Sequence, residues 1–310
     1  MKLQSLCNSL CVLLATASAF ASISSQAETR CPGNIAGLRP RIVAGALLVI
    51  PVKINQSGPF EFMVDTGSQV TVIDPALATE LHLKPQGTVG LVSAASYANA
   101  SFTLLNTLEA NFHAVERPYA IVQDLGQIQA ADARIRGVLG ENFLAHFDLL
   151  IDYAHNLICL DETEAMRDRV QGERIPFVRP QHPDSEVPFT ERLVISVHLS
   201  GAGTRQILLQ LDSGSDGPIL YARNGEKELP LLQHSTLRKG NVSIGQSAFA
   251  DLPPQDLRIG TRTMSRIPFV TPATVGKDVP GREEDGLLPT LLFRRVFICA
   301  ADHYVILDPR

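Results

Sequence analysis

The amino-acid sequence predicts an all-β protein made of two related lobes. Three observations support this prediction. Runs rich in β-branched residues alternate with turn-forming residues, an apolar run ends twice in an Asp-Ser/Thr-Gly motif, and a glycine landmark follows each motif at nearly equal spacing. The chain has 310 residues, 45% of them hydrophobic and 19% charged, so it can bury a sizeable core.

The N-terminal 27 residues have the pattern of a signal peptide. Lys2 precedes an apolar stretch from Leu10 to Ala15, and small residues that suit a cleavage site follow. The apolar stretch is much shorter than the roughly 20 residues that a membrane-spanning helix needs. We therefore expect an exported protein, periplasmic or secreted, whose mature form has no membrane anchor.

Removal of the signal peptide would leave three cysteines, Cys31, Cys159 and Cys299, so at most one disulfide can form within the chain. Cys159 and Cys299 lie in apolar strand-like runs, where we expect buried free thiols. The pairing among the three stays open at this point.

A β-hairpin is expected to open the first lobe and to lead into Asp65. Its strands would be Leu47 to Ile54 and Phe60 to Val64, with turn-forming residues between them. Beyond Asp65 the pattern predicts a strand over Val70 to Ile73 and a short helix over Pro75 to Leu81.

The sequence after residue 192 repeats this plan. Leu193 to Leu199 and Ile207 to Leu211 are apolar runs separated by a turn, and the second run ends at Asp212. Gly137 lies 72 residues after Asp65, and Gly286 lies 74 residues after Asp212. Two landmarks at nearly equal spacing indicate an internal repeat.

A hairpin is expected to close each repeat, over Leu149 to Leu160 in the first and Val296 to Leu307 in the second. Asp148 and Asp152, on the first of these strands, are expected to face solvent. The sequence thus predicts a signal peptide (1–27), an irregular lead-in (28–46), a first lobe (47–161), a Pro-rich linker (162–192) and a second lobe (193–310).

The two motifs, Asp65-Thr66-Gly67-Ser68 and Asp212-Ser213-Gly214-Ser215, suit chemistry that needs two carboxylates. Two carboxylates some 3 Å apart share one proton, because both charges cannot persist side by side. The ionised member can then activate a water, and the protonated member can hydrogen-bond a substrate carbonyl.

Three pairs of motif residues are expected to support the carboxylates: Gly67 and Gly214, Thr66 and Ser213, and Ser68 and Ser215. The glycines lack a Cβ and allow backbone N–H groups to approach the carboxylates. The hydroxyls of the second pair can brace one loop against the other, and those of the third pair can hydrogen-bond the outer carboxylate oxygens.

Other chemistries are poorly supported. The net charge of −5 without a basic block gives no reason to expect nucleic acid as a partner. The metalloprotease motif H-E-x-x-H, the serine-hydrolase motif G-x-S-x-G and any C-x-x-C or local His/Cys cluster do not occur in the sequence. We therefore expect neither a metal ion nor another cofactor.

The segment Phe62 to Ser68, followed by Gly137 to Gly140, resembles the retropepsin and pepsin-like aspartic proteases, in particular bacterial retropepsin-like enzymes with two lobes in one chain. The resemblance covers roughly Leu47 to the C-terminus. It implies two acid-protease β-barrel-like lobes with an active-site cleft between them, and a catalytic dyad of Asp65 and Asp212. The function implied is that of an aspartic-type endopeptidase.

The resemblance also implies a β-hairpin flap from the first lobe that covers a polypeptide substrate in extended conformation. Within Gly90 to Phe102, Tyr97 is a candidate for the aromatic residue that relatives often carry in the flap, although an exposed loop residue is the plainer interpretation.

The second motif departs from the family pattern at Gln210, at Asp216-Gly217 and at Pro289. These departures keep two alternatives open. In one, the protein is a catalytically inactive peptide-binding protein that retains the fold. In the other, it is a retropepsin-like homodimer that uses only the aspartate of the first lobe. The single-chain hypothesis instead predicts an active monomer.

Overall fold

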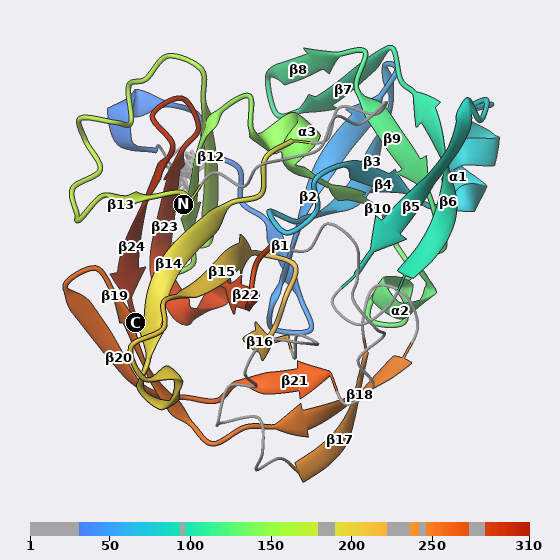
Figure 1. Cartoon of the computed structure of the whole chain (residues 1–310). Helices are drawn as coiled ribbons and strands as arrows, with labels where there is room; N and C mark the ends of the chain where they lie inside the picture. Colours follow the sequence, from blue (N-terminus) through green and yellow to red (C-terminus); the bar gives the residue numbers. More distant parts are fainter. Residues whose placement is uncertain (1–30, 94–96, 179–189, 222–235, 242–245, 273–282) are drawn as a thin grey trace, which may run out of the picture.

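The computed structural model describes residues 31–93, 97–178, 190–221, 236–241, 246–272 and 283–310. The predicted signal peptide lies outside these residues. Within them, no helix is long and apolar enough to cross a membrane. Strands dominate and helices are few and short, so the predicted all-β class with two lobes is confirmed (Figure 1).

The sheet of the first lobe contains β1 (Arg41–Val43), β2 (Leu47–Ile54), β3 (Ser57–Val64), β4 (Thr71–Ile73), β5 (Gly87–Val92), β6 (Tyr97–Leu104), β7 (Thr107–Ala110), β8 (His113–Glu116), β9 (Tyr119–Val122) and β10 (Ile135–Leu139). Its helices are α1 (Pro75–Glu80), α2 (Gly126–Gln129) and α3 (Glu141–Leu144). The predicted strand at 47–54 and the predicted helix after Pro75 are confirmed.

The sheet of the second lobe contains β14 (Val194–Leu199), β15 (Ile207–Asp212), β16 (Ile219–Leu220), β17 (Thr236–Asn241), β18 (Gln246–Asp251), β19 (Gln255–Ile259), β20 (Arg262–Ile267), β21 (Val270–Pro272) and β22 (Gly286–Pro289). The described residues also contain the 3₁₀ turns η1 (Pro32–Asn34), η2 (Ser200–Ala202) and η4 (Thr290–Leu292).

The two sheets repeat each other strand by strand. The order is β5-β6-β9-β4-β10-β3-β2-β7-β8 in the first lobe and β17-β18-β21-β16-β22-β15-β14-β19-β20 in the second. In each lobe the glycine-landmark strand, β10 or β22, is parallel to the strand before the Asp motif and antiparallel to the strand after it. The repeat seen in the sequence therefore extends over nine strands of each lobe, and β1, which pairs with β2, lies outside it.

A third sheet joins the lobes, with the order β12-β11-β23-β24-β13. It combines the closing hairpin of the first lobe, β11 (Asp148–Asp152) and β12 (Leu157–Asp161), with that of the second, β23 (Phe293–Cys299) and β24 (Tyr304–Pro309). The hairpins pair through β11 and β23, where Leu150 lies opposite Phe297. Strand β13 (Ile175–Pro176), from the predicted linker, covers the edge at β24.

The expectation for Asp148 was wrong. Its side chain is only 2% exposed, and the guanidinium of Arg167 donates to it at 2.6 Å. Arg167 covers the carboxylate from the segment after β12, and the N–H of Ala300 donates to it at 3.1 Å, so both groups replace solvent around it. A buried carboxylate needs such a partner.

The hairpin before Asp65 is set by its turn residues. Asn55 and Gln56 both have positive φ, 49° and 66°, as a two-residue hairpin turn requires. The register then places the side chains of Phe62 and Val64 in the core, both 0% exposed. The strand therefore ends directly before Asp65, and its last residues are buried in the core.

The expected free thiol at Cys159 was also wrong, because Cys159 forms a disulfide with Cys31. The lead-in, expected to be irregular, folds back on the joining sheet, and Leu38 and Ile158 exchange both of their backbone hydrogen bonds. This contact brings residue 31 to β12, which the sequence pattern could not reveal. Cys299 is a buried free thiol, as expected.

The disulfide is expected to contribute strongly to stability because it joins residues 128 positions apart. Replacing Cys31 and Cys159 together with Ala should lower the free energy of unfolding by about 5 kcal/mol, the order that loop-closure entropy gives for a loop this long. Urea unfolding followed by circular dichroism measures this change. The control, Cys299→Ala, removes a buried thiol without a crosslink, and an equal loss in both variants would contradict the prediction.

Candidate active site

The first Asp motif lies on a loop that a strand from later in the chain holds in place. Strand β10 passes between β3 and β4, and the backbone N–H of Asp65 donates to the carbonyl of Leu139 at 3.0 Å. A Cβ atom at Gly137 would overlap the ring of Phe62, so glycine is required where β10 lies beside β3. The second motif has the same support from β22, which runs between β15 and β16.

The two motifs meet within one chain. A Cβ atom added at Gly67 would lie 2.6 Å from Cγ of Asp212, and one added at Gly214 would lie 2.6 Å from Cγ of Asp65. The carboxyl side chains of Asp65 and Asp212 hydrogen-bond each other. The structure thus brings together both residues predicted to form the dyad.

Each glycine also donates to the carboxylate of its own motif. The N–H of Gly67 lies 2.8 Å from Oδ1 of Asp65, and that of Gly214 lies 2.7 Å from Oδ1 of Asp212. Each carboxylate is therefore fixed by a backbone donor on one side and by the opposing loop on the other.

Thr66 and Ser213 brace the two loops reciprocally, as the sequence predicts. The N–H of Thr66 donates to Oγ of Ser213 at 3.1 Å, and the N–H of Ser213 donates to Oγ1 of Thr66 at 3.0 Å. Each hydroxyl then donates across the lobes to a strand carbonyl, that of Leu211 or Val64. Both side chains are buried, so these four hydrogen bonds lock the relative position of the lobes at the dyad.

The side chains of the third predicted pair, Ser68 and Ser215, make different hydrogen bonds. The hydroxyl of Ser68 donates to Oδ2 of Asp65 at 2.7 Å, as expected. The hydroxyl of Ser215 donates instead to the carbonyl of Gly217 at 2.8 Å, which corrects the prediction for that side chain. Ser215 reaches the dyad through its backbone N–H, which bonds Asp212. The reason is the turn at Asp216-Gly217, which brings a carbonyl within reach of the hydroxyl.

Gln210, a departure from the family pattern, has a partner in the other lobe. Its side chain is 4% exposed, and its Nε2 donates to the carbonyl of Gly67 at 3.0 Å. The residue two positions before the first aspartate is Met63, which is buried in an apolar cluster. The polar side chain therefore adds a contact between the lobes and does not weaken the strand.

Asp212 is the better shielded member of the pair, at 8% exposure. Burial raises the pKa of its carboxyl well above the usual value, and the charge of Asp65 and the hydrogen bond to it raise the pKa further. The backbone N–H groups of Gly214 and Ser215 act in the opposite direction. Burial and the neighbouring charge therefore both favour the neutral form of the Asp212 carboxyl.

Sequence reasoning missed three residues around the dyad. Glu141 follows β10 and Thr290 follows β22, at equivalent places in the repeat, and both are buried. The hydroxyls of Tyr153 and Thr290 hydrogen-bond at 2.6 Å, and burial raises the pKa of Tyr153 to about 12, with Asp212 among the further causes. The only sequence signal was a charged residue within the apolar stretch Gly137 to Leu144.

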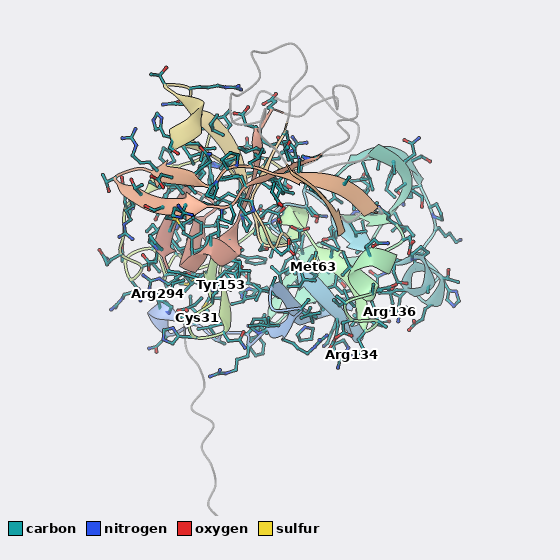
Figure 2. All side chains as sticks on the ribbon, turned by 90° about the horizontal axis from the view of Figure 1, so that it is seen from below. Cys31, Met63, Arg134, Arg136, Tyr153 and Arg294 are labelled. Carbon is teal, nitrogen blue, oxygen red and sulfur yellow. A yellow bond between two sulfur atoms is a disulfide. The ribbon has the colours of Figure 1, made fainter. Side chains whose placement is uncertain are left out.

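Figure 2 shows Tyr153 on the same side of the molecule as Cys31, around the joining sheet, whereas Arg134 and Arg136 lie toward the outer part of the first lobe. Arg136 pairs there with Asp74 at 2.7 Å, and Arg134 pairs with Asp132 at 2.8 Å. These ion pairs belong to the periphery of the lobe and not to the dyad.

The segment predicted to contain the flap, Gly90 to Phe102, lies in the hairpin of β5 and β6 at one edge of the first-lobe sheet. The second lobe has an equivalent hairpin, β17 and β18, which the sequence did not indicate. The side chain of Tyr97, the flap candidate, lies outside the described part of the structure. Within that part, no group of three His, Cys, Asp or Glu residues is arranged to hold a metal ion.

Comparison with known protein families gives a match within the first lobe. Residues 50–143 match the model of a family described as aspartyl protease. No curated protein matches the chain. Among solved structures, the chain is similar to a retropepsin-like aspartic protease from Rickettsia conorii at 22% identity, over 41% of this chain and 90% of that one, with a TM-score of 0.31. The family match, which contains Asp65 and Gly137, confirms the predicted resemblance to the aspartyl proteases for the first lobe.

Proposed function

We propose that this chain, whose first lobe matches the aspartyl protease family, is an aspartic-type endopeptidase that works as a single chain. The observation that carries the proposal is the meeting of Asp65 and Asp212, with each motif glycine pressed against the carboxyl group of the other lobe. An arrangement of two hydrogen-bonded carboxyl groups that share a proton is suited to activating a water molecule.

In the proposed reaction, the carboxylate of Asp65 takes a proton from a water held between the two side chains, and the water oxygen attacks the carbonyl carbon of a peptide bond. Asp212, protonated, hydrogen-bonds the carbonyl oxygen as negative charge develops on it. The tetrahedral intermediate collapses when the amide nitrogen receives the proton held by Asp65, and the C–N bond breaks. Neither a metal ion nor a covalent intermediate enters these steps.

The proposed substrate is a polypeptide in extended conformation. Strand β5 ends the sheet of the first lobe, and its hairpin with β6 offers backbone groups to which an extended chain could pair. Both carboxyl groups come from one chain, which favours a monomer over a homodimer built on the first lobe alone.

We also propose that the protein is exported, to the periplasm or the extracellular medium. The predicted signal peptide supports this location. The disulfide between Cys31 and Cys159 supports it independently, because disulfides persist in oxidising compartments.

The test is cleavage of a denatured protein mixture by the chain without residues 1–27, between about pH 3 and pH 7, with pepstatin as inhibitor. We expect cleavage on the acid side, loss of cleavage with pepstatin, and elution as a monomer in size-exclusion chromatography. The absence of cleavage at every pH, with pepstatin binding retained, would favour the peptide-binding alternative. Activity that eluted only with a dimer would contradict the single-chain proposal.

A further inference from the structure

Glu141 is a buried carboxyl group that the proposed reaction does not use. It is the first residue of α3, directly after β10, and only 3% of its surface is exposed. Its Oε1 atom has no hydrogen-bond partner among the described residues. Burial of a polar atom without a partner costs free energy, so a glutamate at this place calls for an explanation.

The backbone around Glu141 supports the Asp65 loop directly. The N–H of Glu141 donates to the carbonyl of Ser68 at 2.8 Å, and the N–H of Asn142 donates to the carbonyl of Gln69 at 3.2 Å. Ser68 in turn donates its hydroxyl to Oδ2 of Asp65. A displacement of the backbone at Glu141 would therefore move Ser68 and, through its hydroxyl, the carboxylate of Asp65.

The second lobe shows that this place can be filled without an ionisable group. Glu141 lies four residues after Gly137, and Thr290 lies four residues after Gly286. Thr290 is fully buried and satisfied by the hydroxyl of Tyr153 at 2.6 Å. The first lobe thus carries an acid where the repeat has a neutral, hydrogen-bonded pair.

The surroundings of Glu141 favour its neutral form. Burial raises the pKa of its carboxyl well above the usual value, and the charge of Asp65 raises it further. Among ionisable groups, Asp65 on the motif loop raises the pKa of Glu141, and Asp212 lies on the other side of Asp65 in the dyad.

We propose that Glu141 is a positioning residue for the dyad, whose neutral carboxyl packs behind the Asp65 loop and whose ionisation at higher pH loosens that loop and ends activity. The inference rests on the proposed function and deepens it, since it adds a third acid to the protonated Asp212 among the groups whose ionisation limits cleavage at high pH. A buried carboxylate next to Asp65 would have to gain water, and the segment that holds Ser68 would have to open to admit it.

The first test compares the pH profile of kcat/KM for the wild type, Glu141→Gln and Glu116→Gln. Gln imitates the neutral carboxyl and cannot ionise, so Glu141→Gln should retain cleavage near pH 4. The fall of its kcat/KM at high pH should begin about one pH unit later, which is a gain of about tenfold over the wild type on that side of the profile. Glu116 is exposed in the same lobe, and its variant should follow the wild type. An unmoved alkaline limb in Glu141→Gln would overturn the proposal, as would loss of acid activity in a variant that folds normally.

The second test does not depend on activity. A carboxyl whose folded-state pKa is raised stabilises the fold at low pH and loses that contribution as the pH rises from the unfolded-state pKa to the folded one. In an Asp212→Asn background, Glu141→Gln should therefore melt like its parent near pH 4 and at a higher temperature than its parent near pH 7. Equal melting temperatures at every pH would overturn the inference.

The two tests separate the inference from the proposed function. If no variant cleaves any substrate while the melting temperatures diverge with pH, the proposed protease activity fails and Glu141 is still a buried neutral acid behind the loop. If cleavage occurs and the melting temperatures diverge but the profile of Glu141→Gln matches the wild type, only the positioning role fails.

Discussion

Replacing either Asp65 or Asp212 with Asn is expected to lower kcat/KM for peptide cleavage by at least about a thousandfold, the order of effect seen when a group that transfers the proton of the reaction is removed. The reason is that the proposed reaction needs one ionised and one protonated carboxyl in contact. Asn cannot take the proton from water at residue 65. At residue 212, Asn would leave the pair without the acid that Asp65 hydrogen-bonds.

The measurement is cleavage of a fluorogenic peptide by the two variants and by Asp168→Asn, which changes an exposed carboxylate elsewhere. All three should show the circular dichroism spectrum of the wild type, and only the Asp168 variant should cleave. An Asp212→Asn variant with full activity would point to a dimer that uses only the first lobe. Activity that returned when the two inactive variants were mixed would point in the same direction.

The fold could be predicted to the extent that its signals are local. Alternating turns and β-branched runs marked β2, β3 and β15, because a strand with a buried face requires such a pattern. The nearly equal spacing of Gly137 and Gly286 from the two aspartates indicated the repeat, since each glycine lets its strand lie beside a neighbour where a side chain would clash. The dyad followed from the same symmetry.

The remaining features depend on contacts between distant parts of the chain, and no local pattern encodes them. The disulfide of Cys31 arises because the lead-in pairs with residue 158. Gln210 reads as a defect in a strand until Gly67 is placed opposite it. No local pattern marks Glu141 as buried, and its burial arises because α3 packs behind the Asp65 loop.

The second large effect on activity is expected from substitution of the motif glycines. A side chain is excluded at Gly67 and Gly214 because the carboxyl group of the other lobe lies against them, and not because of their own backbone conformation. A Cβ atom at Gly67 would lie 2.6 Å from Cγ of Asp212 and 2.8 Å from both of its carboxylate oxygens. Real Cβ atoms do not approach other atoms so closely. Asp212 is held by Gly214 and packed in the interior, so it cannot move aside without separating the lobes.

Gly67→Ala should therefore lower kcat/KM by about a hundredfold or more, since a displacement of about 1 Å at the reacting groups has an effect of that size. Overpacking at this contact should also lower the free energy of unfolding by about 1–3 kcal/mol. Peptide cleavage and urea unfolding measure the two effects, and Gly214→Ala should reproduce both because Asp65 lies opposite it in the same way.

Gly217→Ala is the matched control, because Gly217 lies in the second motif loop and a Cβ atom there would meet nothing within 4 Å. Its variant should keep activity and stability close to the wild type. If Gly67→Ala behaved like this control, the two loops could not be in the contact that places Asp65 against Asp212, and a dyad within one chain would have to be abandoned. If both motif-glycine variants lost activity while the control kept it, the approach of the two lobes at the dyad would be established independently of any change to the carboxyl groups themselves.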